Sequence, residues 1–589
     1  MRLTLPTELQ DPELDQRGYP GELACYRAGL KQVNPDQQPN GWGRLHHAMG
    51  RAHYFHHRFE QNAVAYCRQA VAECTLALTT LTAAAFPKAH LAVLQDAMRA
   101  YLGLGDTAQA QALREQGLAV FRELLKAQPS SRQRERLELE FSGFSQLAVD
   151  LLVQEGATVA ALEAAERYKN RTLTWMLDAW QETVVSPSLA EMATLVDDAT
   201  ALVMWHLSPD ALTRFVVLPG ATAPLVTAST QPSQRLDTWL KTWDQDYQDY
   251  RSKGKTAEEP SLQAHPWRQN LAARLATLAD ILDISSLEAT LADAGITQVR
   301  LVPHRDLHRL PLQALFSTPL TVTYLPSVQV GLTLQRREPG WVVTAQTSIL
   351  SVEEPASAEL PRLVFAEIES ALICQSFSQP IRLDADAATE ARVTAALAAG
   401  PSLVHFTGHG FFNDRQPRQS ALAGADQLTV EAIRALSLSG CGLVSLAACE
   451  TAVTGSTTIQ ADYVGLASAF LKAGAGAVLS TLWTVESVSN AWLMVYFYDQ
   501  LLMGRSPAVA LRAAQQWLRT VTQGELANWL QAWLTPELEA SDPHAYDALV
   551  TEIRAIQPDG DKMEVTQLPY ADPYYWAAFV IAGISIKNT

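Results

Sequence analysis

The sequence predicts an α/β protein in which a mostly parallel sheet flanked by helices follows an all-α domain of helical hairpins. From about residue 345 onward, short apolar runs alternate with helical patterns, and this alternation builds parallel sheets. Before about residue 180, apolar residues instead recur at spacings of three and four, which is the period of an amphipathic helix.

Length and composition set the class of protein. A chain of 589 residues is too long for a single core, and 48% hydrophobic with 18% charged residues is an ordinary globular composition. Lys and Arg number 45 against 62 Asp and Glu, and the net charge of −17 disfavours non-specific binding to nucleic acid. Six scattered cysteines without a CxxC spacing indicate free thiols in a reducing compartment.

Neither end of the chain nor its interior predicts a membrane segment. The start, MRLTLPTELQDPELD, has no apolar core of a secretory signal, and no run of eighteen apolar residues occurs. We therefore expect a soluble, cytoplasmic protein that does not interact with membranes.

The helical region is predicted to contain three hairpins, at roughly 43–82, 87–129 and 134–178. Leu91, Leu94, Met98 and Tyr101 share one face of the helix over 87–104, and Gly105-Asp106 supplies a stop and the next N-cap. Consecutive hairpins favour an α-solenoid over a plain bundle. The pattern of small residues resembles tetratricopeptide repeats, although the turns recur nearer every 50 than every 34 residues.

The strands begin at about residue 199. ATALVMWHL and LTRFVVLPG are typical of a hairpin and ITQVRLVP of a buried strand, whereas YWAAFVIAG (575–583) is expected to be a final edge strand in antiparallel orientation. The expected domains are 1–190, 191–340 and 341–589.

Two apolar runs of the third domain each end at a reactive residue. SLVHFTGHG ends around His409, and GLVSLAACET reaches Cys449. Since catalytic groups of parallel sheets gather at the carboxyl ends of strands, an imidazole and a thiol would meet at one sheet edge. This layout is typical of a cysteine nucleophile with a histidine base.

Such chemistry also needs N–H donors aimed at the oxyanion. The backbone N–H of Gly410, which a substrate can approach closely, and that of Cys449 itself are the candidates. Taken singly, a cysteine after a strand is more often a core residue, and a histidine there is more often a satisfied polar group.

Other candidates have a structural interpretation. His53 and His57, in a group with His46, His47 and His56, have a metal-ligand spacing, but no HExxH accompanies them and a solvated or interface helix is favoured. His304 and His308, between Pro303 and Pro311, are expected in a turn. Cys441 lies at the opposite end of the strand that leads to Cys449 and is a poor nucleophile candidate. The loops 413–427 and 453–462 follow the two reactive residues, and we expect one or both to be mobile and to set specificity.

Residues 199–583 resemble the CHAT family, caspase-like peptidases often joined to tetratricopeptide repeats. The matching motifs are LVPHRDLHRLPLQAL (301–315), LPRLVFAEIE (360–369), VHFTGHG (404–410), LVSLAACET (443–451), GLASAFLKAGAGAVLSTLWTV (465–485) and DPYYWAAFVIAG (572–583). The resemblance implies a caspase-like sheet with His409 as general base and acid, Cys449 as nucleophile, and an oxyanion site near Gly410. It further implies a separase-like half over 191–340, a catalytic half over 341–589, and a bacterial setting in which the helical repeats receive a signal and a protein partner, such as a defence or cell-death effector, is cut.

One departure concerns specificity. Relatives often carry two adjacent acids after the Trp-x-Val motif, whereas this chain has Glu486-Ser487, so no acidic specificity residue is carried over. The expected function is a cysteine endopeptidase that needs no cofactor or metal and is regulated by its helical domain. The alternatives are a catalytically silent interaction scaffold and another acyl transfer by the same thiol.

Overall fold

The structure, a computed structural model, describes residues 17–57, 63–177, 186–253, 259–336, 342–353, 363–384, 387–408, 410–411, 421–422, 428–448, 465–556 and 566–584. The chain forms two compact units. The first contains the residues up to Tyr168 and the turn residues Leu207–Thr213, and the second contains Lys169–Leu177 and most of the chain after residue 183. The three predicted domains and their boundaries stay a prediction.

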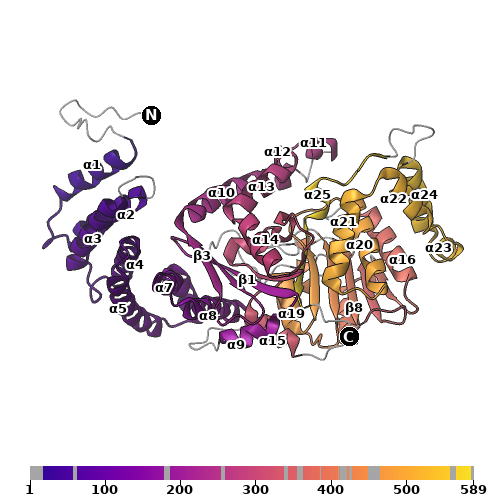
Figure 1. The fold of residues 1–589 in the computed structure, drawn as a ribbon, viewed down its shortest axis with the longest axis horizontal. Coiled ribbons are helices and arrows are strands. Elements are labelled where there is room, and N and C mark those ends of the chain that lie inside the picture. The colour runs from indigo at the N-terminus through magenta and orange to yellow at the C-terminus, as the bar shows by residue number, and fades with distance from the viewer. Residues whose placement is uncertain are drawn as a thin grey trace. The chain divides into compact units, whose positions relative to one another are not determined.

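Apart from the turn Leu207–Thr213, the first unit is all-α, as predicted (Figure 1). Its helices are α1 (Tyr19–Leu30), α2 (Pro39–His57), α3 (Ala63–Thr80), α4 (Pro87–Gly103), α5 (Thr107–Lys126), α6 (Ser131–Glu140), α7 (Gly143–Gln154) and the first part of α8 (Thr158–Leu177). The predicted apolar face of α4 is confirmed, because Leu91, Leu94 and Met98 are fully buried in the core that α4 shares with α5 and α7. Asp106 caps α5 by accepting a hydrogen bond from the N–H of Gln109 at 3.1 Å. The assignment of these hairpins to tetratricopeptide repeats stays a prediction.

The third hairpin differs from the expectation. The single helix predicted over 134–155 is two helices, α6 and α7, separated by Phe141 and Ser142. Ser142 and Gly143 are weak helix formers, and together they allow the chain to turn there. Gly143 also packs so closely on Gln95 that a Cβ would collide with it.

The second unit is built on a sheet of eleven strands in the order β3-β2-β1-β4-β5-β14-β13-β12-β8-β6-β7. The strands are β1 (Thr200–Leu207), β2 (Leu212–Val217), β3 (Leu225–Ser229), β4 (Gln298–Val302), β5 (Thr321–Tyr324), β6 (Ile349–Glu353), β7 (Ile381–Asp384), β8 (Leu403–Gly408), β12 (Leu443–Ala448), β13 (Ala477–Thr481) and β14 (Phe579–Gly583). A small second sheet contains β9 (Gly410–Phe411), β10 (Ala421–Leu422) and β11 (Leu428–Thr429).

Helices flank this sheet, as expected for an α/β fold. Figure 1 shows α16, α20 and α21 lying over the strands of the second half of the sheet. The helices and 3-10 turns of the unit are α9 (Leu189–Met192), η2 (Ala193–Leu195), α10 (Thr230–Lys253), α11 (Glu259–Gln263), α12 (Pro266–Gln269), α13 (Leu271–Ile281), α14 (Ile284–Asp293), η3 (Arg305–Arg309), η4 (Leu312–Leu315), α15 (Val328–Gln335), α16 (Val364–Gln375), α17 (Glu390–Ala398), α18 (Val430–Arg434), α19 (Leu466–Ala473), α20 (Ser487–Leu502), α21 (Pro507–Thr520), α22 (Gln523–Gln531), α23 (Pro536–Ser541), α24 (Pro543–Ile556) and α25 (Pro573–Trp576). The predicted fold class is therefore confirmed.

Strand direction reverses within the sheet between β14 and β13. β1, β4, β5 and β14 are parallel to one another, β13 is antiparallel to β14, and β13, β12, β8, β6 and β7 are parallel again. The carboxyl ends of β8, β12 and β13 consequently share one edge of the sheet, which we call the β8–β12 edge, and those of β4 and β5 lie at the opposite edge.

The prediction that residues 575–583 form an edge strand is wrong. β14 lies in the middle of the sheet, between β5 and β13, although its antiparallel pairing with β13 agrees with the expectation. All five residues of β14 are buried. A strand covered on both faces and both sides needs an uninterrupted apolar sequence, and FVIAG is one.

A glycine ends α19 where the chain turns into β13. Gly474 has φ +124, and a Cβ at this position would lie 2.8 Å from the backbone N of Ser439. Both the backbone conformation and the close approach therefore require glycine. The residues between α19 and β13 thus form a helix-to-strand turn.

Among the helices that the structure describes, none combines the length and the apolar composition needed to span a bilayer.

Candidate active site

The two strands that lead to the predicted catalytic residues are neighbours at the centre of the second half of the sheet. β8 and β12 pair in parallel through six register pairs, the last of which joins Gly408 to Ala448. Their side chains are buried because the runs LVHFT and LVSLA are apolar enough to be covered on both faces. His409 and Cys449 come directly after this last register pair and lie outside the described residues, so the dyad stays a prediction.

The chain beyond position 409 enters the small second sheet. Gly410 and Phe411 form β9, which pairs antiparallel with β10, and β10 pairs antiparallel with β11. β10 lies within the predicted loop 413–427, so part of that segment is a buried strand. The rest of this loop and the loop 453–462 lie outside the described residues.

A row of polar side chains crosses the second half of the sheet beneath the β8–β12 edge. Ser351 of β6, His405 of β8 and Ser445 of β12 are register partners, and all three are fully buried. Register partners in parallel strands point to the same face of a sheet. Buried polar groups need polar partners, and two helices supply them here.

Helix α16 supplies a carboxylate to this row. The Glu369 side chain is 1% exposed, and its Oε1 lies 3.1 Å from Nε2 of the fully buried His405. Its other oxygen accepts a hydrogen bond from Nδ2 of Asn490, in α20, at 2.7 Å. Burial raises the pKa of Glu369 above its ordinary value, although His405, Thr407 and Asn490 each favour the charged form.

The row of Ser351, His405 and Ser445 also contacts α20 directly, through Tyr498. The Tyr498 hydroxyl donates to Ser445 Oγ at 3.1 Å, and its ring meets that of His405 edge to face at 5.4 Å. Ser351 Oγ lies 2.7 Å from Ser370 Oγ of α16. His405 and Ser445 each lie three residues before the end of their strand. Through them, β8 and β12 are connected to the covering helices α16 and α20.

This polar network was not identified from the sequence. A histidine inside an apolar strand, as in LVHFT, indicates a buried imidazole that needs a partner. Glu369 stands in the matched motif LPRLVFAEIE, yet nothing in the sequence pairs it with His405, because the two come together only when α16 packs on β8.

The segment after β13 forms part of the same edge. The N–H of Thr484 donates to the Tyr247 hydroxyl at 3.2 Å, and Tyr574 donates to the Thr484 carbonyl at 3.1 Å. Glu486 then caps α20 by accepting from the N–H of Ser489 at 2.8 Å. In this structure Glu486 therefore marks a helix start.

Of the described cysteines, all but Cys25 are buried. Burial raises the pKa of Cys441 to about 12 and that of Cys374 to about 11, so both stay protonated at neutral pH. This agrees with the expectation that Cys441 is a poor nucleophile.

His304 and His308 lie in and beside the short turn η3, as expected for the segment between two prolines. Both are buried, and His304 stacks on His206 with ring centroids 4.8 Å apart. His308 Nε2 lies 3.4 Å from Nζ of the buried Lys169, which also donates to the Pro303 carbonyl. Burial, reinforced by the charge of Lys169, lowers the pKa of His308 well below its usual range.

This burial predicts a pH dependence of stability. Below about pH 6.5 the unfolded chain protonates His308 and the folded chain does not, so the stabilising effect is complete above that pH and is lost as the pH falls. Between about pH 7.5 and 5.5, His308 alone should lower the free energy of unfolding by about 1 kcal/mol. Urea unfolding experiments at the two pH values measure this effect. The free energy of unfolding should fall less in the His308→Gln variant than in the parent chain, and the difference should equal that amount. Equal losses in the two proteins would contradict the assignment.

The histidine group of residues 46–57 lies along α2, which agrees with the helical interpretation. Two of its members face carboxylates of neighbouring helices: His46 Nδ1 lies 2.6 Å from Glu73, and His47 Nε2 lies 2.8 Å from Asp96. Within the described ranges, no group of three or more His, Cys, Asp or Glu side chains is arranged to hold a metal ion.

Known proteins resemble this chain in its fold. One is the separase of the Saccharomyces cerevisiae separase–securin complex, with 12% identity over 95% of this chain and 48% of the separase chain, at a TM-score of 0.49. The Arg-specific cysteine proteinase gingipain R has 11% identity over 54% of this chain and 68% of its own, at a TM-score of 0.32. This chain thus spans about half the length of the separase chain. A search of curated protein sequences found no match.

A family model gives the assignment. The model of the CHAT domain matches residues 272–584, which is more than half of the 589 residues and includes both β8 and β12. The resemblance seen in the sequence motifs is thereby confirmed. This chain belongs to the CHAT family, the family of caspase-like cysteine peptidases that its motifs resemble.

Proposed function

We propose that this protein is a cysteine endopeptidase in which Cys449 is the nucleophile and His409 is the general base and acid. The observation that carries the proposal is the register of β8 and β12, whose last pair, Gly408 with Ala448, directly precedes these two residues. Neighbouring strands lie about 4.8 Å apart and successive Cα atoms about 3.8 Å apart. Side chains attached one residue beyond a paired end are therefore within reach of each other.

The chemistry that this pair would perform begins with proton transfer from the Cys449 thiol to His409. The thiolate attacks the scissile carbonyl carbon, and the backbone N–H groups of Gly410 and Cys449 stabilise the oxyanion. The C–N bond breaks as His409 protonates the leaving amine, which leaves a thioester on Cys449. A water molecule then gives a proton to His409 and attacks the thioester, and the thiol returns as the acid product leaves.

The polar network under the β8–β12 edge supports the proposal physically. A nucleophile and its base need to be held within a fraction of an ångström of their productive geometry. Glu369, His405 and Asn490 tie β8 to α16 and α20 directly below the strand ends. Such a rigid base suits a site whose reacting groups stand on the last residues of two strands.

The regulatory part of the proposal rests on the sequence. The helical first unit is proposed to receive an activating signal, from a protein or another ligand, and the peptidase to cut a protein partner in a bacterial defence or cell-death setting. No cofactor takes part in the proposed reaction.

Thiol labelling tests the nucleophile directly. In a Cys25→Ser background, which removes the exposed cysteine, the full-length chain is treated with limiting iodoacetamide at pH 7 and its peptides are analysed by mass spectrometry. A thiol with a pKa of about 12 is ionised about a thousandfold less than an ordinary thiol with a pKa near 8.5. Because the more basic thiolate is also the stronger nucleophile, which offsets part of this difference, we expect Cys449 to be alkylated at least about fiftyfold faster than Cys441.

The His409→Ala variant provides the control for activation of the thiol. Its Cys449 should react more slowly at pH 7 than that of the parent chain, because the imidazole that promotes the thiolate is gone. Labelling of Cys441 in preference to Cys449 would sink the proposed site.

A further inference from the structure

The two halves of the sheet meet along a narrow junction between β5 and β14. These strands share a single register pair, Tyr324 with Ala582, whereas β8 and β12 share six. Side chains supply much of the remaining connection. Gln313, of the first half, donates from Nε2 to the carbonyls of Ala577 at 2.9 Å and Phe579 at 3.0 Å.

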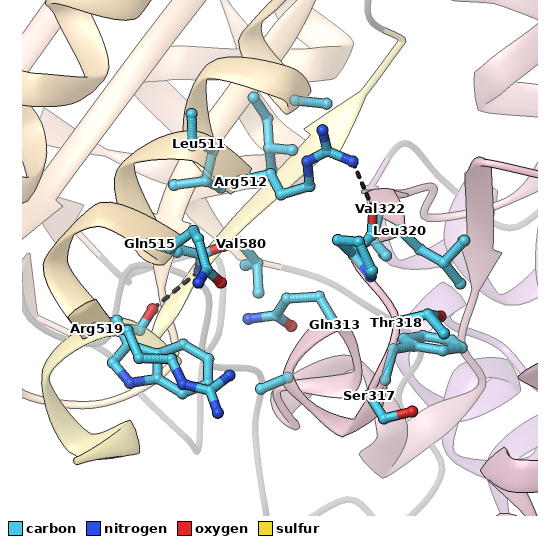
Figure 2. A pocket seen from close by; sticks show the side chains of 18 of the residues that line it. Gln313, Ser317, Thr318, Leu320, Val322, Leu511, Arg512, Gln515, Arg519 and Val580 are labelled. Carbon is cyan, nitrogen blue, oxygen red and sulfur yellow. Dashed lines mark hydrogen bonds between the residues drawn. The ribbon is translucent and has the colours of Figure 1, made fainter. Parts of the chain in front are cut away.

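A cavity of about 580 Å³ opens at this junction, between η4 and β5 on one side and α21 and β14 on the other (Figure 2). We call it the junction pocket. Leu320, Val322, Leu511 and Val580 give it apolar walls from both halves of the sheet. Its volume lies within the range of pockets that hold small organic ligands.

The charge in the junction pocket has one sign. Of the described residues that line it, Arg512 and Arg519 are charged and none is acidic. They are two turns apart on α21, so both lie on the same face of the helix, and Figure 2 shows both among the side chains at the pocket with Gln313 and Gln515 between them. In a chain with a net charge of −17, this pair gives the pocket a locally positive charge.

Neither guanidinium is neutralised within the described part of the chain. Arg512 donates from Nη1 to the carbonyl of Pro319, and Arg519 lies over the Trp576 ring at 5.3 Å, but neither has a described carboxylate as an ion-pair partner. The carboxylate of Glu288 instead contacts two residues that line the pocket, because it accepts hydrogen bonds from the N–H groups and hydroxyls of Ser317 and Thr318.

We propose that the junction pocket binds a small organic anion with an apolar body, of the aryl or acyl phosphate class. The phosphate would accept charge-assisted hydrogen bonds from Arg512 and Arg519, and the apolar body would cover the leucine and valine walls. Because the walls come from both halves of the sheet, a bound ligand stabilises the junction between them and raises the stability of the second unit. No residue of β8 or β12 lines the pocket, so we expect this binding to be independent of the proposed peptidase reaction.

Calorimetric titration of the full-length chain with phenyl phosphate tests the proposal. We expect a dissociation constant below about 1 mM at low ionic strength. Phenol keeps only the apolar contacts and inorganic phosphate keeps only the hydrogen bonds to the arginines. Each should bind at least about tenfold more weakly than phenyl phosphate. Phenyl phosphate should also raise the thermal unfolding temperature.

Variants locate the binding. Arg519→Gln, which removes no described hydrogen bond, should weaken phenyl phosphate binding about tenfold, and Arg512→Gln should weaken it by a similar factor. Arg392→Gln, on the exposed face of α17, is the matched control and should leave the dissociation constant unchanged. Cys449→Ala should leave it unchanged too. Absence of binding to the folded chain, unchanged binding in both pocket variants, or inorganic phosphate binding as tightly as phenyl phosphate would each overturn the proposal.

Discussion

The Cys449→Ala variant is expected to lose at least about 10⁴-fold in the rate of substrate cleavage while keeping its fold, because the thioester cannot form without the sulfur. His409→Ala should cause a loss of similar size. Since the two residues act as one unit, the double variant should be hardly slower than either single variant. Candidate substrates are the proteins encoded beside this chain, and cleavage is measured by gel electrophoresis and by mass spectrometry of the products.

Cys25→Ala is the matched control, since Cys25 is an exposed cysteine in α1. It should cleave at the parental rate. If the parent and Cys449→Ala process every substrate equally, or if neither does under any activating condition, the chain is an interaction scaffold rather than a peptidase. A product that retains an acyl group on an amine or thiol acceptor would instead indicate the other acyl transfer.

The Glu369→Leu variant is expected to lose about 2–3 kcal/mol of stability, the usual effect of leaving buried polar groups without their partner. The substitution leaves His405 Nε2 and Asn490 Nδ2 facing an apolar side chain, and both residues are at most 5% exposed. The same change should lower the cleavage rate at temperatures well below unfolding, because β8 loses its tie to α16 and α20 directly below position 409.

Urea unfolding, followed by tryptophan fluorescence and circular dichroism, measures this loss. The control is Glu431→Leu, an exposed glutamate of α18, which should change the free energy of unfolding by less than about 0.5 kcal/mol. A loss below about 1 kcal/mol for Glu369→Leu would show that the pair is not a structural tie.

Local sequence patterns predicted many of the elements correctly. The strands around LVHFT and LVSLA, the buried face of α4 and the cap at Asp106 follow from apolar periodicity and from hydrogen bonding within a few residues. The break between α6 and α7 was missed because Ser142 and Gly143 weaken a helix only modestly, and the close approach of Gly143 to Gln95 of another helix is invisible in the sequence.

Long-range placement was harder to predict. The strand at 579–583 was recognised, but its position between β5 and β13 depends on pairing with residues about 100 and about 260 positions away. The same holds for Glu369, whose partners His405 and Asn490 come from a separate strand and a separate helix.

From its sequence alone, this chain could be assigned to the CHAT family and to an α/β class with a helical region before it. The sequence also indicated a pair of reactive residues that come after two apolar runs. These properties are encoded in local periodicity and in short motifs. Only the tertiary structure decided that the two runs are adjacent, in register and tied from below by Glu369, and that two arginines of α21 share a pocket at the junction of the sheet. Which strands pair and which buried polar groups meet depends on the free energy of packing the whole chain, and no local pattern contains that information.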